Sequence, residues 1–132
     1  MTNKIRHIKI YPEKGSKGEL LSQANLQENE GIVGDRHSDI SLLTTAAQLF
    51  KEQNPGGLCF ARFKENILID ADLHGIDHIT IGDAVLGLGA KKKICIPECS
   101  HYKTYFLNGK KCPFSEGVAF ARVLKGGAIA SR

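Results

Sequence analysis

Short apolar stretches alternate with polar breaks along most of the chain, and this pattern predicts a domain built mainly of strands. Lys4 to Tyr11 (KIRHIKIY) places isoleucines between polar residues, as in a half-buried strand. Ile5, Ile8 and Ile10 do not share one parity, so we expect a bulge or an end effect here. Pro12 to Gly18 (PEKGSKG) then interrupts regular structure.

The middle of the chain predicts a strand followed by a helix. Glu19 to Glu30 is polar with scattered leucines, which fits either a strand with a loop or a short helix. Asp39 to Leu43 is typical of a short buried strand. Thr44 or Thr45 can cap a helix that runs to about Gln53.

The second half predicts a hairpin and a final apolar segment. Ile79–Ile81 and Ala84–Leu88 flank the turn Gly82-Asp83, which is a strong hairpin signal. Gly117 to Gly127 closes the pattern with an apolar stretch that carries one arginine. The pattern gives about six or seven short strands and two helices. We therefore predict one domain over residues 1–132, mainly β with minor α, forming a partly closed β-barrel with one or two short helices.

Composition narrows the setting and the partners. The 132 residues are 42% hydrophobic and 24% charged, with a net charge of +4, which is ordinary for a globular domain. There is no apolar run of membrane length and no signal-peptide pattern, so we expect a cytoplasmic protein without a membrane partner. Aromatic residues are 7% and tryptophan is absent, which argues against nucleic acid as a partner.

Gly31 to His37 (GIVGDRH) is the first candidate site. Its glycines allow close backbone approach, and an acid, a guanidinium and an imidazole in Asp35, Arg36 and His37 would suit the rim of a polar pocket. Taken alone, the segment favours a hairpin turn in which Asp35 caps its own backbone and Arg36 lies in solvent. Asn66, between a charged pair and an apolar stretch, could hold a turn through side-chain bonds or face a ligand.

The stretch from Lys91 to Gly127 is the second candidate site, because it holds three of the four cysteines among several lysines. In a reducing cytosol, cysteines are free thiols, metal ligands or redox groups. Neighbouring cations favour the thiolate, so Cys99, with His101 beside it, could take part in sulfur chemistry or bind a soft metal ion. Glu98 works against this because a negative neighbour raises a thiol pKa. The alternative is a buried, inert Cys99.

A zinc site is a further interpretation of the same stretch. Cys95, Cys99, His101 and Cys112 are suitable tetrahedral ligands, but their C-x3-C-x-H-x10-C spacing lacks the paired C-x2-C of common structural sites. Under this interpretation the protein is a non-catalytic, zinc-stabilised or interaction module.

Six short motifs in order resemble the MOSC domain, named for the C-terminal domain of molybdenum-cofactor sulfurases, in its small stand-alone bacterial form. They cover the chain from Gly31 to Gly127. The motifs are G-I-x-G-D-x-H at residues 31–37 with S-L-L at 41–43, R-F-x-E-N-I at 62–67, I-G-D-A at 81–84, E-C-x-H at 98–101, C-P at 112–113 and F-A-R-V-L-K-G-G at 120–127.

The resemblance implies a β-barrel and a role around the molybdenum cofactor, either as a sulfur carrier with transferase-like activity or as a cofactor-dependent protein. The family's characteristic cysteine corresponds to Cys99, the expected reactive atom and metal ligand, and His101 is its expected catalytic neighbour. The expected partners are a molybdenum-pterin cofactor or a sulfur donor protein. The candidate cofactor-binding residues are Gly34, Asp35, Arg36, His37, Arg62, Asn66, Arg122 and Lys125.

Two departures from the family pattern affect these expectations. The segment between His37 and Ser41 is shorter than the family often shows, so the rim of the pocket would differ. The sequence ends at Arg132, where many relatives continue with another strand. An open barrel edge at that point would favour a homodimer.

Overall fold

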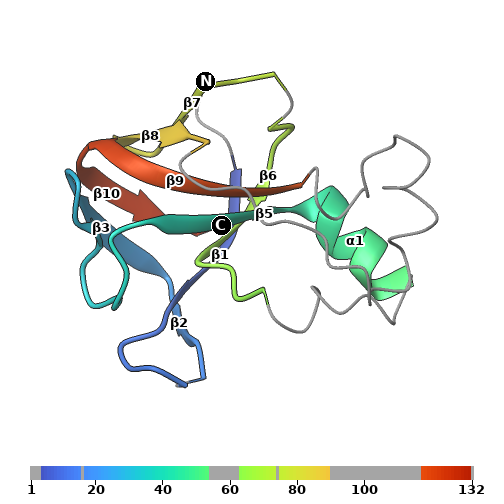
Figure 1. The fold of residues 1–132 in the computed structure, drawn as a ribbon, viewed down its shortest axis with the longest axis horizontal. Helices are drawn as coiled ribbons and strands as arrows, with labels where there is room; N and C mark the ends of the chain where they lie inside the picture. The colour runs from blue at the N-terminus through green and yellow to red at the C-terminus, as the bar shows by residue number, and fades with distance from the viewer. Residues whose placement is uncertain (1–3, 16, 54–62, 74, 90–116, 132) are drawn as a thin grey trace.

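The computed structural model describes residues 4–15, 17–53, 63–73, 75–89 and 117–131. Within these ranges a curled seven-stranded sheet forms a half-barrel, with a three-stranded sheet and one helix against it (Figure 1). The elements are β1 (Lys4–Ile10), β2 (Glu19–Leu21), β3 (Gln23–Gln27), β4 (Gly31–Ile32), β5 (Ile40–Thr44), α1 (Thr45–Gln53), β6 (Ile67–Asp70), β7 (His78–Ile81), β8 (Ala84–Leu88), β9 (Val118–Lys125) and β10 (Gly127–Ala130). The predicted mainly β fold with a minor helical part is confirmed.

The large sheet has the strand order β2-β1-β6-β5-β9-β8-β7. Every neighbouring pair is antiparallel except β5 and β6, which are parallel. Parallel neighbours need a crossover connection, and α1 lies in the chain between these two strands. The expected hairpin is present as β7 and β8, with Gly82 of its turn at φ +55°.

β1 contains the irregularity that its isoleucines predicted. Its register against β6 shifts between Ile5 and His7, so one extra residue is inserted on β1. The shift brings Ile5, Ile8 and Ile10 all into the buried core despite their mixed parity. The same geometry leaves His7 and Lys9 half-buried on the outer side of the strand.

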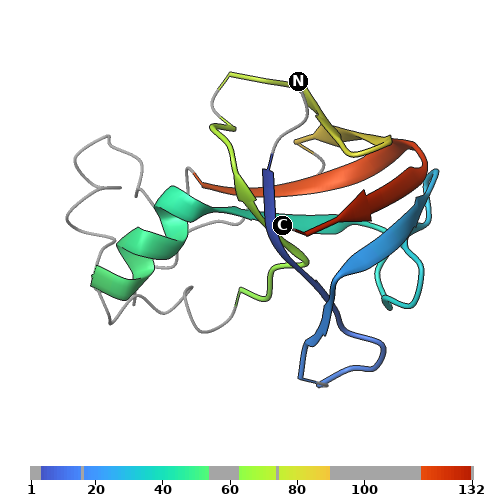
Figure 2. The same ribbon diagram turned by 180° about the vertical axis from the view of Figure 1, so that it is seen from behind.

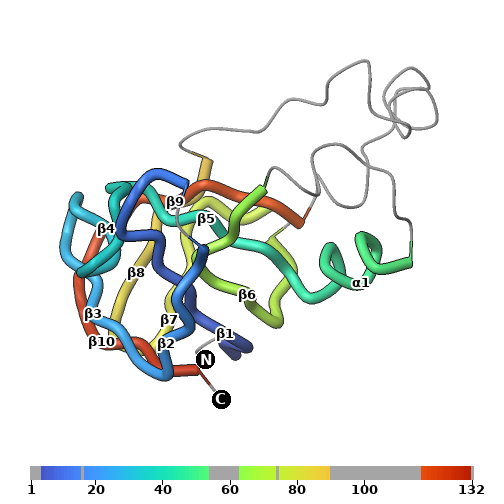
Figure 3. Tube along the Cα trace, turned by 90° about the horizontal axis from the view of Figure 1, so that it is seen from below, coloured from blue at the N-terminus to red at the C-terminus, as the bar shows by residue number. Residues whose placement is uncertain are grey.

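The smaller sheet, ordered β10-β3-β4, packs beside β8 and β9, as the views in Figures 2 and 3 show. The Asn29 N–H donates to the Val123 carbonyl at 3.0 Å, which ties the turn after β3 to β9. A Cβ on Gly127 would lie 2.6 Å from the Asp83 carbonyl oxygen. A side chain at this position would therefore prevent β10 from approaching the β7–β8 hairpin.

The core lies on the inner face of the curled sheet, and a smaller apolar cluster lies on its outer face beside α1. In the outer cluster, the rings of Phe63 and Phe120 meet edge to face with centroids 5.8 Å apart. The Thr44 hydroxyl accepts a hydrogen bond from the Ala47 N–H at 3.1 Å, so Thr44 is the N-cap of α1. Among the described residues, no helix has the length and apolar character needed to cross a membrane.

Candidate functional site

Asn66 lies just before β6 and is the centre of a buried hydrogen-bond network, the Asn66 network. Its side-chain oxygen accepts from the Ser41 N–H at 3.0 Å, and its side-chain nitrogen donates to the Lys9 carbonyl at 3.1 Å and to the Asp35 carboxylate at 3.3 Å. Only 3% of Asn66 is exposed. Its own N–H donates to the Ser41 carbonyl at 2.9 Å. Asn66 thus holds the turn through side-chain bonds and joins β1, β5 and the segment before β5.

The Ser41 hydroxyl, on β5, is also part of the Asn66 network. It lies 2.8 Å from the Lys64 carbonyl and 3.0 Å from the Asn66 side-chain oxygen, and its one proton can serve either acceptor. The Asn66 N–H also lies 3.1 Å from this hydroxyl oxygen. Both partners are buried, so leaving one without the other would strand polar groups away from water.

Asp35 links the Asn66 network to the loop that was predicted as a pocket rim. One carboxylate oxygen accepts from the Tyr11 N–H at 2.7 Å and from Asn66, while the other accepts from the His37 N–H at 3.1 Å. The bond to His37 is the predicted local cap. The bonds to Tyr11 and Asn66 are long-range contacts that the turn signature alone does not reveal.

Arg36 and His37 are therefore fixed through their backbone while their side chains stay exposed. The Arg36 N–H donates to the Tyr11 carbonyl at 3.2 Å. Gly31 allows the same loop to fold tightly, because its φ is +85° and a Cβ there would lie 2.7 Å from the His37 carbonyl oxygen. The result is a rigid loop that presents a guanidinium and an imidazole to solvent.

A second group of charged residues, which sequence reasoning left unassigned, lies on the outer side of β1. The Glu65 side chain is 11% exposed, and its carboxylate lies 3.0 Å from His7 Nε2 and 3.7 Å from Lys9 Nζ. Burying a carboxylate is costly unless cations or hydrogen-bond donors compensate it. Here the two compensating residues, His7 and Lys9, lie at alternate positions of one strand. The outward parity of His7 and Lys9 is the signal that could have indicated this pairing.

Tyr11 lies at the end of β1 between the two groups. Its hydroxyl donates to the Glu65 carbonyl at 3.1 Å, and the Lys64 ammonium lies 5.7 Å from the ring centroid. Burial raises the pKa of Tyr11 to about 12, and the nearby carboxylates of Glu65 and Asp35 act in the same direction. The Tyr11 hydroxyl therefore stays protonated at physiological pH and donates a hydrogen bond to Glu65.

Of the other predicted residues with described positions, Gly34 lies in the turn after β4 with a φ of +98°, while Arg122 and Lys125 lie on β9. Arg122 is exposed and pairs across the ladder with Gly87, while its neighbour Ala121 pairs with Ile40 at the start of β5. Arg122 and Phe120 share the outer face of β9 by strand alternation. Lys125 is exposed at the far end of the same strand.

The cysteine chemistry predicted from the sequence lies outside the described residues. This holds for the candidate reactive and metal-binding residues and for one arginine: Arg62, Cys95, Cys99, His101 and Cys112. Within the described ranges, no group of three or more histidines, cysteines, aspartates or glutamates is placed to hold a metal ion.

The described candidates fit an anionic cofactor in part. Arg36 and His37 are exposed and fixed at their backbone, which suits a phosphate group. The side chains of Asp35 and Asn66 are hydrogen-bonded within the protein, so they position the loop and do not contact the ligand.

No protein-family model matches the chain, and neither does any curated protein. Among solved structures, the chain is similar to the YUAD protein from Bacillus subtilis. The crystal structure of that protein superposes with a TM-score of 0.60 at 17% sequence identity, covering 99% of this chain and 92% of that chain. At this identity the similarity concerns the fold: nearly the whole chain shares its architecture with the YUAD protein.

Proposed function

We propose that this protein acts around the molybdenum cofactor, binding a molybdenum-pterin group, carrying sulfur as a persulfide on Cys99, or both. The supporting observation is the Asn66 network. Two of the six motifs of the MOSC resemblance, residues 31–37 with 41–43 and residues 62–67, are separate in the chain, and the hydrogen bonds of Asp35, Ser41 and Asn66 join them. Motifs that meet in space are expected of a shared site.

In this proposal the Asn66 network positions the loop, and the exposed cations bind the ligand. Arg36 and His37 stand on the fixed loop, and Arg122 lies on the outer face of β9, one residue beyond the Ala121–Ile40 pair. Arginine can grip a phosphate with two parallel hydrogen bonds, and His37 can add a third donor. A bound molybdenum-pterin group would supply the phosphate for these cations and a soft metal for the Cys99 thiolate.

For sulfur carriage, Cys99 acts as a thiolate towards a donor protein. Its sulfur attacks the outer sulfur of a cysteine persulfide on the donor, the donor's S–S bond breaks, and the donor cysteine leaves as a thiolate. The transfer forms one S–S bond and breaks one, so it needs no outside oxidant. The lysines near Cys99 in the sequence favour the thiolate form.

Incubation with a low-molecular-weight persulfide, followed by mass spectrometry, tests the carrier proposal. We expect one added sulfur on the wild type and none at this position in Cys99→Ser, with Cys59→Ser as the matched control that retains the adduct. No adduct on the wild type, or an equal adduct on Cys99→Ser, would refute it.

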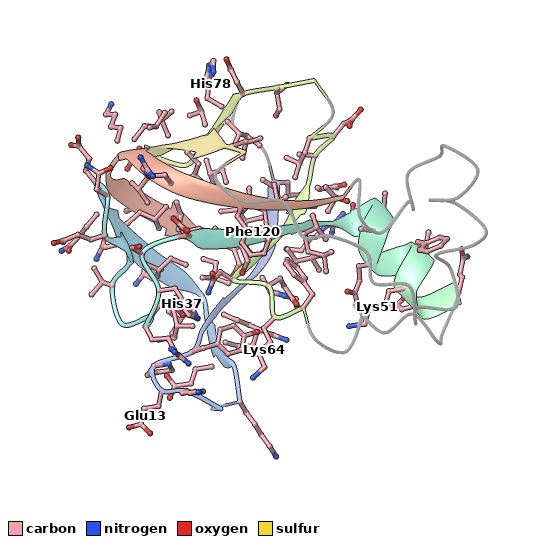
Figure 4. All side chains as sticks on the ribbon, in the orientation of Figure 1. Glu13, His37, Lys51, Lys64, His78 and Phe120 are labelled. Atoms are coloured by element: carbon pink, nitrogen blue, oxygen red, sulfur yellow. The ribbon has the colours of Figure 1, made fainter. Side chains whose placement is uncertain are left out.

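Cofactor binding is tested separately by reconstitution with the isolated molybdenum-pterin cofactor and measurement of retained molybdenum after desalting. We expect Arg36→Ala and Arg122→Ala to retain less molybdenum than the wild type. Lys51→Ala changes a residue of α1 that lies away from His37 in Figure 4, and this variant should retain as much as the wild type. Equal retention by all four proteins, or none by the wild type, would contradict the binding proposal.

A further inference from the structure

The outer side of β1 carries a group of cations that the proposed function does not use. His7, Lys9 and Tyr11 occupy alternate positions, so their side chains leave the same face of the strand. A Cβ on Gly18 would lie 3.1 Å from the Lys9 side chain and 3.0 Å from the Tyr11 ring, so the two side chains lie side by side next to Gly18. Lys64, over the Tyr11 ring, adds an exposed ammonium from the neighbouring segment.

The orientation of His7 is set by Glu65. Nε2 of the ring is 3.0 Å from the nearly buried carboxylate, which leaves Nδ1 as the other polar atom of the ring. A protonated imidazole donates from both nitrogens, so it can satisfy Glu65 and still donate one bond to a ligand. Arg6 is less suitable for this purpose because Asp70 holds its guanidinium at 3.0 Å.

The charges of the group depend on His7. When His7 is neutral, the Lys9 ammonium at 3.7 Å balances the Glu65 carboxylate. Protonation of His7 gives the group a net positive charge. An anion should therefore bind when His7 is charged and bind weakly when it is not.

We propose that His7, Lys9 and Lys64 form a binding site for a phosphate-type oxyanion that is controlled by the charge of His7. Two ammoniums and an imidazolium are compact donors without the planar fork that matches a carboxylate, and they suit a tetrahedral anion approached from several directions. The ligand is free phosphate or the phosphate group of a small ester.

The test is an NMR titration of the full chain with inorganic sulfate at pH 6 and pH 8, against chloride at matched ionic strength. Sulfate keeps its charge over this range, so a change in affinity reports on the protein. We expect saturable shifts of the β1 amides with sulfate, tighter binding at pH 6, and no saturable shifts with chloride. No saturable sulfate binding, or the same affinity at both pH values, would overturn the proposal.

Variants locate the site. Exposed ion pairs contribute about 0.2–1 kcal/mol each, so Lys9→Gln and Lys64→Gln should each weaken sulfate binding by up to about fivefold. His7→Gln should remove the pH dependence. Lys51→Gln and His78→Gln change residues that lie away from β1's outer side in Figure 4 and should bind like the wild type. Because Lys64 is exposed, its variant keeps the fold, and wild-type affinity in Lys64→Gln would refute its assignment.

The source of the anion is resolved by comparing phosphate with glycerol phosphate at pH 6. Equal affinity for the two indicates a site for the free anion, and tighter binding of glycerol phosphate indicates a site for a phosphate ester. Binding of either compound that survives in Lys9→Gln/Lys64→Gln would place the anion elsewhere and overturn the proposal.

Discussion

Replacing Asn66 with alanine should destabilise the protein far more than an ordinary polar substitution. The side chain is buried and bonds to the Ser41 N–H, the Lys9 carbonyl and the Asp35 carboxylate. Alanine removes all three bonds and leaves a small space that the backbone of three segments surrounds. The loss therefore affects the packing of β1, β5 and the loop of Asp35 together.

The magnitude follows from which groups lose their last side-chain partner. The Ser41 hydroxyl keeps the Lys64 carbonyl and the Asp35 carboxylate keeps the Tyr11 N–H, so these groups stay bonded. The buried Ser41 N–H loses the bond to Asn66 and is left as an unsatisfied donor. An unsatisfied buried group costs about 1–3 kcal/mol, and the two part-buried bonds to Lys9 and Asp35 add roughly 0.5 kcal/mol each, the lower end for a lost hydrogen bond. We expect Asn66→Ala to lower the free energy of unfolding by about 2–4 kcal/mol.

Urea denaturation followed by circular dichroism measures this change, and thermal unfolding gives a second value. With an unfolding entropy of about 2.1 cal/mol/K per residue, the expected loss corresponds to a Tm lower by roughly 7–14 °C. Asn25→Ala is the matched control, because Asn25 is exposed on β3 and should cost little. A loss below about 1 kcal/mol for Asn66→Ala, or one equal to the control, would show that the Asn66 network does not stabilise the fold.

Three further predictions concern single residues. In an ultraviolet absorbance titration, one tyrosine should ionise near pH 12, and this step should be absent from Tyr11→Phe; because the folded pKa is raised, the stability from Tyr11 is present below about pH 10 and lost as the pH rises towards 12. Gly31→Ala should lower the free energy of unfolding by more than Gly15→Ala, since both have positive φ but a Cβ meets backbone only at Gly31; equal losses would contradict the close approach. Thr44→Ala should cost about 0.5–2 kcal/mol in urea denaturation, and Thr44→Ser should recover most of it; no loss would exclude the cap.

Periodicity predicted the elements whose side chains alternate between core and solvent. β1, β5, β7 and β8 were all expected near their observed positions, and the bulge in β1 followed from the parity of its isoleucines. β2, β3 and β4 were not predicted as separate strands, because they are only two to five residues long; β2 and β3 are mostly exposed, and β4 is a single buried pair of residues. An exposed short strand carries no apolar alternation, so tertiary pairing decides its structure.

The site was predicted in its parts but not in its connections. The Gly31–His37 segment and Asn66 were both singled out, yet their bond joins residues 31 positions apart, and the Asn66 bond to Lys9 spans 57. Turn chemistry is local and reveals the cap of Asp35 on His37. Contacts across strands depend on the register of the sheet, which local pattern does not determine.

Glu65 and Asn66 explain why the two groups of charged residues should respond to one another. Asn66 lies at a bend just before β6, and the two adjacent side chains reach different groups: Glu65 reaches His7 while Asn66 reaches Asp35. The peptide between them is held by two hydrogen bonds: the Asn66 N–H donates to the Ser41 carbonyl at 2.9 Å, and the Glu65 carbonyl accepts from the Tyr11 hydroxyl at 3.1 Å. Movement of this dipeptide must therefore alter both the loop of Arg36 and the orientation of His7. A perturbation confined to Asn66 should be visible in the imidazole resonances of His7, and independence of the two would mean that the segment is not rigid.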